Sequence, residues 1–233
     1  MPPYTWLLFD ADGTLFAYDG AEEQALKNVF AHYQLPFYKE VATAYKRINQ
    51  TMWKRLEEQT ITLMDLRWQR FADLFTELGI DQDAVAFSRT YLHYLGQAAE
   101  LIPGTLEVLE QLQERFHMAI ITNGINDVQH SRIRLSGLGR FFPFIFTSEA
   151  IGVFKPARGF FDAVFAGIGQ PAKENVLVIG DSLSSDMAGA VGYGLDTCWY
   201  NPRGEQDKNG YPITYEIRDL AQLLEILKIA IAK

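Results

Sequence analysis

Cysteine and histidine are scarce in this 233-residue sequence. The single cysteine, Cys198, excludes an intrachain disulfide and a metal site built from several thiolates. It lies in the apolar run 197–200, where we expect a buried structural thiol. The four histidines are scattered and show no metal-ligand spacing: His32, His93, His117 and His130. The sequence therefore does not predict a zinc-type site.

Positive charge is also scarce, since 21 lysines and arginines stand against 29 acidic residues and give a net charge of −8. A protein that binds a nucleic-acid polymer needs an excess of basic side chains to displace counterions from the phosphate backbone. The composition therefore disfavours such a partner. A small phosphorylated metabolite remains compatible, because local geometry and a bound metal ion override net charge.

Long hydrophobic runs are missing as well. The N-terminal region has no basic segment, and its apolar run at residues 6–9 is far too short for a signal peptide or a membrane span. We therefore expect a cytoplasmic location and no membrane partner. Nothing in the sequence indicates an oligomeric state.

The pattern of apolar residues divides the chain into two kinds of segment. Residues 6–9 predict a short buried strand, whereas residues 19–99 carry apolar side chains at the three-to-four spacing of about four amphipathic helices. From residue 102 onward strands and helices alternate, which predicts a parallel sheet covered on both faces. We expect further strands at 118–121, 144–147, 176–179 and 195–200. We expect helices at 105–116, 126–136, 155–167, 186–193 and 220–231.

Two aspartates directly follow the first predicted strand. Asp10 and Asp12 precede Gly13, which allows the backbone to turn sharply. Ligands of open α/β sheets bind beyond the carboxyl ends of the strands, so the pattern predicts an acidic site at this edge. An ordinary strand-to-turn exit fits equally well, since Asp and Gly are common in turns.

Later strands also end in polar residues, and parallel strands bring such ends to one edge. The candidate set there is Thr122, Asn123, Lys155, Asp181 and Asp186. Carboxylates suit Mg²⁺, the Thr122 hydroxyl suits phosphate oxygens, and Lys155 adds a fixed positive charge that Asp186 could orient. Each feature has a plainer interpretation: a turn at 122–124, a solvated lysine before a proline, and a tight turn with an N-cap at 180–186. Their order along the chain favours the functional interpretation.

Taken together, these motifs resemble those of the haloacid dehalogenase (HAD) superfamily. Residues 10–14 are similar to its first motif, 122–124 to its second, 155–156 to its third and 180–186 to its fourth. The resemblance implies an α/β fold with a Rossmann-like parallel-sheet core, formed by residues 1–15 and 96–233. It also implies an inserted all-helical cap domain of the C1 type at residues 16–95.

The resemblance assigns a role to each motif residue. Asp10 would be the nucleophile that forms an aspartyl-phosphate, and Asp12 the acid and base. Mg²⁺ would be held by Asp10, Asp181 and the backbone carbonyl of Asp12. Asp186 would lie beside these ligands and not bind the ion directly. Phosphate would be bound by Thr122, Asn123 and Lys155. Dehalogenases lack an aspartate at the position of Asp12, so the resemblance favours phosphoryl chemistry over cleavage of a carbon–halogen bond.

Within the superfamily, residues 49–53, 61–62, 70–71 and 198–201 are similar to the pyrimidine nucleotidase branch. This implies a nucleoside 5′-monophosphate as substrate. Asn49 is a candidate for polar contact with the base or ribose, and Trp53 is a second candidate, although aromatics at helical spacing more often belong to a core. Alternatives are a phosphatase or phosphomutase acting on phosphoglycolate, a sugar phosphate or an acylneuraminate phosphate, and a catalytically silent binding protein. The presence of every motif carboxylate argues against the silent protein.

Overall fold

A computed structural model describes residues 3–58 and 60–229. The chain divides into two compact units, one running up to Ala17 and resuming at Glu100, the other comprising Tyr18–Ala99. The sequence predicted the helical insert at 16–95, and the compact helical unit of the structure spans Tyr18–Ala99. Phe16 forms a bridge with Leu101, and the Ala17 N–H donates to the Glu100 carbonyl over 3.1 Å, so both connections belong to the sheet unit.

The first unit is built on a six-stranded, all-parallel sheet in the order β3-β2-β1-β4-β5-β6. The strands are β1 (Trp6–Phe9), β2 (His117–Thr122), β3 (Phe144–Thr147), β4 (Val176–Gly180), β5 (Asp196–Tyr200) and β6 (Tyr215–Ile217). This arrangement confirms the predicted parallel sheet. The edge strand β6 was not predicted, because three residues are too few to establish the alternation of a strand.

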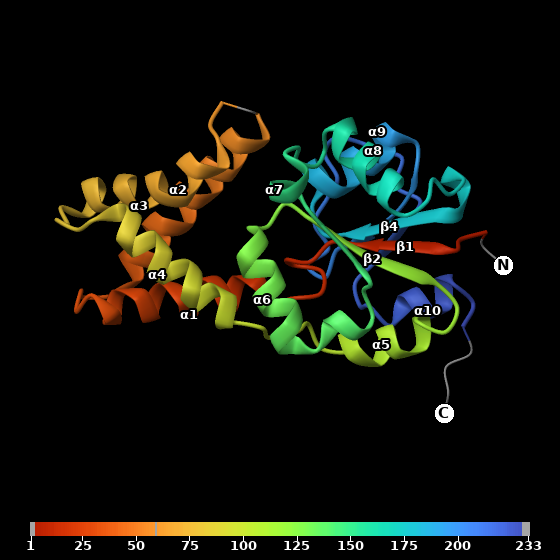
Figure 1. The fold of residues 1–233 in the computed structure, drawn as a ribbon, viewed down its shortest axis with the longest axis horizontal. Helices are drawn as coiled ribbons and strands as arrows, with labels where there is room; N and C mark the ends of the chain where they lie inside the picture. The colour runs from red at the N-terminus through yellow and green to blue at the C-terminus, as the bar shows by residue number, and fades with distance from the viewer. Residues whose placement is uncertain (1–2, 59, 230–233) are drawn as a thin grey trace. The chain divides into compact units, whose positions relative to one another are not determined.

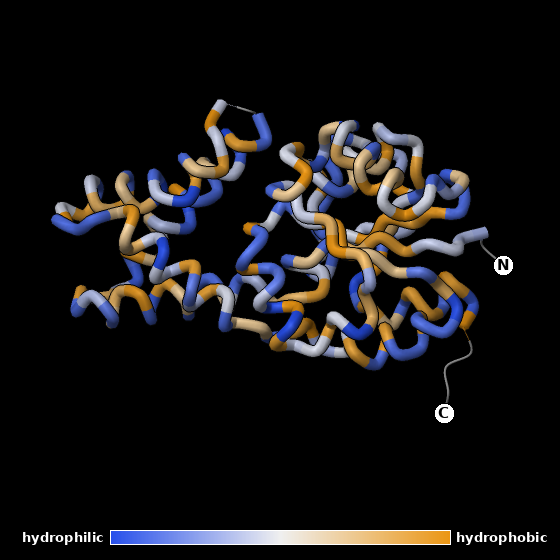
Figure 2. The backbone as a smooth tube through the Cα atoms, viewed as in Figure 1, coloured by the Kyte–Doolittle hydropathy of each residue, from blue (hydrophilic) through white to orange (hydrophobic). Residues whose placement is uncertain are grey.

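Helices cover both faces of this sheet: α8 and α9 lie on one face, and α5 and α10 on the other (Figure 1). The helices of the unit are α5 (Thr105–Leu112), α6 (Asn126–Ser136), α7 (Ser148–Ile151), α8 (Arg158–Gly167), α9 (Ala188–Tyr193) and α10 (Gln222–Ile226). The central strands are therefore apolar on both sides, and their tubes are predominantly orange in Figure 2.

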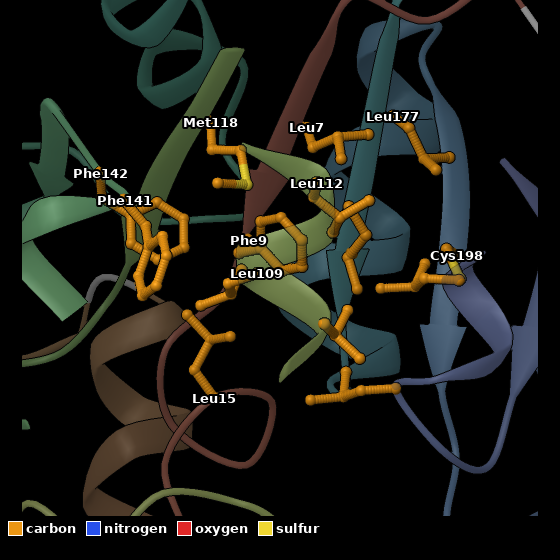
Figure 3. Packing of buried hydrophobic residues seen from close by; sticks show 14 of the residues in the cluster. Leu7, Phe9, Leu15, Leu109, Leu112, Met118, Phe141, Phe142, Leu177 and Cys198 are labelled. Carbon is orange, nitrogen blue, oxygen red and sulfur yellow. The ribbon is translucent and has the colours of Figure 1, made fainter. Parts of the chain in front are cut away.

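Strand β1 shows this two-sided burial most clearly. Leu7 and Phe9 pack with Leu112 on one face, as the close view in Figure 3 shows, whereas Leu8 packs with Phe160 on the other. All three β1 side chains are completely buried. The strand is thus a rigid support for the aspartates that follow it.

Four predicted helices differ in extent from the structure. The helix expected at 155–167 begins at Arg158. The helix expected at 105–116 ends at Leu112 and continues as turns into β2, and the one expected at 186–193 is preceded by a π-helical turn, Leu183–Met187. The helix expected at 220–231 is shorter, Gln222–Ile226, and Lys228 takes a positive φ of 55°. Residues 230–231 of that prediction lie outside the described residues.

The second unit is all-helical, as predicted. Its helices are α1 (Tyr18–His32), α2 (Lys39–Glu57), α3 (Leu63–Leu78) and α4 (Ala84–Gln97). Thr62 and Asp65 form a capping box at the start of α3. Aromatic rings fill the interior, where Phe71 contacts Tyr45, Phe87 and Tyr91.

Across the described ranges, 3–58 and 60–229, we find no helix with the length and apolar character needed to cross a membrane.

Candidate active site

Three adjacent strands bring the predicted motif residues to one edge of the sheet. Central strand β1 pairs with β2 on one side and β4 on the other. Asp10 follows β1, Thr122 ends β2 and Asp181 follows β4. The Asp10 N–H still donates to the Ile179 carbonyl over 2.8 Å, so the sheet holds this residue's backbone firmly.

Lys155 lies in the middle of these strand ends and is 1% exposed. Its Nζ donates to Asp10 Oδ1 over 2.7 Å, to Asp186 Oδ1 over 2.6 Å and to the Ile121 carbonyl over 2.7 Å. An ammonium group has three hydrogens, so its donors are all used. Burial acts to lower the pKa of Lys155, but the charges of Asp10 and Asp186 outweigh it and raise the pKa above its ordinary value. A permanent positive charge is therefore fixed beside Asp10.

The side chain of Asn123 holds the backbone of Lys155 in place. Asn123 Nδ2 donates to the Lys155 carbonyl, and Asn123 Oδ1 accepts from the Lys155 N–H, each over 2.9 Å. A phosphate contact by Asn123, as predicted, would therefore fall to its backbone N–H. Thr122 is buried and its Oγ1 accepts from the Gly124 N–H over 2.9 Å, which leaves the hydroxyl hydrogen to donate.

Three carboxylates gather around Lys155. One oxygen each of Asp10, Asp181 and Asp186 lies within 4.8 Å of the others. Burial raises the pKa of Asp10 despite the nearby Lys155 charge, and burial together with the Asp186 charge raises the pKa of Asp181 to about 7. Such crowded like charges favour a cation, and an all-oxygen donor set suits a hard ion such as Mg²⁺. The residues present thus fit the magnesium ion predicted from the sequence.

The loop after β1 leaves room for Asp181 only because residue 13 is glycine. Gly13 has a φ of 86°, and a Cβ there would overlap the Asp181 carboxylate. The backbone of Asp181 is held as well, because Trp199 Nε1 donates to its carbonyl over 2.9 Å. Sequence reasoning assigned Trp199 no part in the site, because nothing in the pattern of β5 shows which backbone atom an indole will reach.

Asp12 also has two partners that sequence reasoning missed. Gln129 Nε2 and Arg132 Nη1, both from α6, donate to its two carboxylate oxygens. The side chain of Asp12 remains 23% exposed, whereas that of Arg132 is 0% exposed. The sequence offered one indication of this contact. Gln129 and Arg132 are long polar residues three positions apart, on a face of the predicted helix 126–136, and this helix must cover the sheet.

The predicted substrate contacts of the helical unit lie on α2. Asn49 is buried, where its Nδ2 donates to Glu22 Oε1 over 2.6 Å and its Oδ1 accepts from Arg70 Nη1 over 3.0 Å. Trp53 is half-buried. The structure thus gives Asn49 an internal role, and contact of either residue with a substrate stays a prediction.

Comparisons with known proteins agree with this geometry. The model of the haloacid dehalogenase-like hydrolase family matches residues 4–194. The HAD-hydrolase YfnB of Bacillus subtilis is 38% identical over 98% of this chain and 97% of its own length. Its magnesium-bound crystal structure superimposes with a TM-score of 0.91, over 97% of this chain and 99% of that one.

Several relatives carry a named phosphatase activity, and two of them are pyrimidine 5′-nucleotidases. Pyrimidine 5′-nucleotidase PynA of Streptococcus pneumoniae is 34% identical over 96% of this chain and 95% of its own length. Pyrimidine 5′-nucleotidase YjjG of Escherichia coli is 29% identical, over 96% and 98%. The family match and these full-length similarities confirm the resemblance drawn from the motifs: the chain belongs to the haloacid dehalogenase-like hydrolases.

Proposed function

We propose that this protein is a Mg²⁺-dependent phosphomonoester hydrolase that works through an aspartyl-phosphate on Asp10. The observation that carries the proposal is the contact of Lys155 Nζ with both Asp10 and Asp186, at 2.7 and 2.6 Å, in a buried cluster of acidic groups. A carboxylate held at a strand end beside a fixed positive charge is suited to attack a phosphoryl group, whose negative charge the lysine offsets.

The reaction has two displacements at phosphorus. A carboxylate oxygen of Asp10 forms a bond to phosphorus while the bond to the leaving oxygen breaks, and Asp12 gives that oxygen its proton. Asp12 then removes a proton from a water molecule, which bonds to phosphorus as the bond to Asp10 breaks. Inorganic phosphate and free Asp10 result.

The other motif residues bind and orient the phosphoryl group. The Thr122 hydroxyl and the backbone N–H of Asn123 would donate to its oxygens, and Lys155 would neutralise part of its charge. Magnesium would be held by Asp10, Asp181 and the backbone carbonyl of Asp12, with Asp186 next to it. When bound, the ion supplies further positive charge to the phosphoryl oxygens.

The proposed substrate is a pyrimidine nucleoside 5′-monophosphate. Support comes from the two relatives named pyrimidine 5′-nucleotidases, at 34% and 29% identity. Asn49 and Trp53 are the proposed contacts of the helical unit with the leaving nucleoside.

Phosphate release from a panel of nucleoside monophosphates, sugar phosphates and phosphoglycolate tests the proposal, with Asp10→Asn as a control for contaminating phosphatases. We expect pyrimidine nucleotides to have the highest kcat/KM. A higher kcat/KM for sugar phosphates would contradict the nucleotidase assignment but would still support phosphatase activity. Isomerisation of a sugar phosphate without phosphate release would instead indicate a mutase.

A further inference from the structure

The carboxylate of Asp12 is held at both of its oxygens by one helix. Gln129 Nε2 donates to Oδ2 and Arg132 Nη1 donates to Oδ1. Because the two donors lie three residues apart on α6, their side chains share one face of the helix. Asp12 itself lies in the loop after β1, more than a hundred residues away in sequence.

The two donors are themselves held firmly. Gln129 and Arg132 are both buried, and the Arg132 guanidinium lies 4.2 Å from the centre of the Phe16 ring. Helix α6 also begins just beyond the loop that carries Thr122 and Asn123. The donors to Asp12 and the proposed phosphate-binding loop are therefore parts of one continuous segment.

The glycine at position 124 has a physical explanation in this contact. Its φ lies outside the left-handed region, so the backbone conformation does not require glycine. A Cβ at Gly124 would, however, overlap the Gln129 amide. The absence of a side chain at 124 is what lets Gln129 reach Asp12.

We propose that Gln129 and Arg132 are positioning residues that fix the orientation of Asp12 for proton transfer; this inference rests on the proposed role of Asp12 as acid and base. A carboxylate offers about four lone-pair sites, of which the two donors use two, so others remain to carry the transferred proton. General acid catalysis requires hydrogen-bond geometry toward the leaving oxygen. An Asp12 side chain released from either donor can rotate away from that geometry.

The test is a series of phosphate monoesters whose leaving groups range from p-nitrophenol to a nucleoside. Protonation matters most for the poor leaving groups, and kcat/KM reports the first displacement, in which the leaving group departs. Asp12→Asn should therefore lower kcat/KM far more for a nucleotide than for p-nitrophenyl phosphate. Gln129→Leu, Gly124→Ala and Arg132→Met should show the same trend, with an extra loss for the nucleotide on the order of ten-fold. Arg134→Gln, on the exposed side of the same helix, is the matched control and should change neither rate.

Double variants separate positioning from a merely structural role. If Gln129 acts through Asp12, adding Gln129→Leu to Asp12→Asn should change kcat/KM by no more than about two-fold. Losses of equal size for all leaving groups, or losses that add fully to that of Asp12→Asn, would overturn the inference. Gly124→Ala and Gln129→Leu keep the test valid if Arg132→Met does not fold.

Different outcomes of these experiments test the role of Asp12 and the positioning roles of Gln129 and Arg132. If Asp12→Asn itself shows no dependence on the leaving group, the proposed role of Asp12 is wrong and the inference falls with it. If Asp12→Asn shows the dependence and the Gln129 and Gly124 variants do not, only the inference is wrong.

Discussion

Lys155 Nζ lies 2.7 Å from Asp10 Oδ1, and both groups are buried. The two residues are 145 positions apart in sequence and meet at the edge of the sheet where β1 ends between β2 and β4. The same ammonium group also contacts Asp186 at 2.6 Å, so one cation compensates two carboxylates.

Loss of this cation should harm both activity and folding. In Lys155→Met, Asp10 and Asp186 stay buried without their counter-charge, so we expect the metal-free protein to lose about 3–5 kcal/mol of unfolding free energy. We expect kcat to fall on the order of a hundred-fold or more, because a fixed charge beside the phosphoryl group is removed. Urea denaturation and steady-state kinetics measure these effects. Lys54→Met, at an exposed position, is the control; a Lys155→Met protein as stable as that control would contradict the account.

Gly13→Ala should weaken magnesium binding. A methyl group at residue 13 would overlap the Asp181 carboxylate and displace it. Gly104→Ala is a matched control, because Gly104 has a nearly equal φ of 82°, against 86° for Gly13, and open space around it. Both variants should lose about 1 kcal/mol of stability through backbone strain. Only Gly13→Ala should bind Mg²⁺ more weakly in isothermal titration calorimetry, and equal affinities in the two variants would count against Asp181 as a ligand.

Asn49→Ala should destabilise the protein. The change leaves Glu22 and Arg70, both buried, without the amide that links them, at an expected cost of about 2 kcal/mol. Gln50→Ala, at the exposed neighbouring position, should have little effect. Substrate contact by Asn49 predicts in addition a rise in KM for a nucleotide that p-nitrophenyl phosphate does not show. Unchanged stability of Asn49→Ala would rule out the internal role.

Cys198 should be unreactive in the folded protein. The thiol is completely buried, and burial raises its pKa to about 12. Since the reactive species is the thiolate, a thiol reagent at mildly alkaline pH should label Cys198 only after unfolding in urea. The thiol of the unfolded protein ionises at lower pH than the buried one. The unfolding free energy that the buried thiol contributes is therefore lost as pH rises from the ordinary thiol pKa toward 12. Rapid labelling without denaturant would contradict this burial.

The sequence predicted which strand ends would gather polar residues at one edge of the sheet, because the information there is local. Asp10, Thr122 and Asp181 each follow a strongly apolar strand, and the parallel topology then places them together. The partners of Asp12 were missed for the opposite reason. A helical pattern shows that Gln129 and Arg132 share a face, but it does not show that an aspartate from the β1 loop will meet them there.

Other side-chain contacts went unpredicted for similar reasons. Substrate contact by Asn49 stays a prediction, but its internal hydrogen bonds were not predicted. The residue lies among apolar residues at helical spacing, Ile48 and Met52 beside it, and such a position usually faces an interior. Phosphate binding by Asn123 stays a prediction for its backbone N–H, and the contact of its side chain with the backbone of Lys155 was not predicted. A residue type at a strand end indicates a site, but only the fold shows which neighbour takes each hydrogen bond.

The central claim is that Asp10 is phosphorylated during the reaction, and the stereochemical course at phosphorus tests it most directly. Each in-line displacement inverts phosphorus, so two successive displacements give net retention of configuration. We expect retention when an isotopically chiral thiophosphate monoester is hydrolysed in heavy-oxygen water. Inversion would show that water attacks the substrate directly and would contradict the aspartyl-phosphate on Asp10.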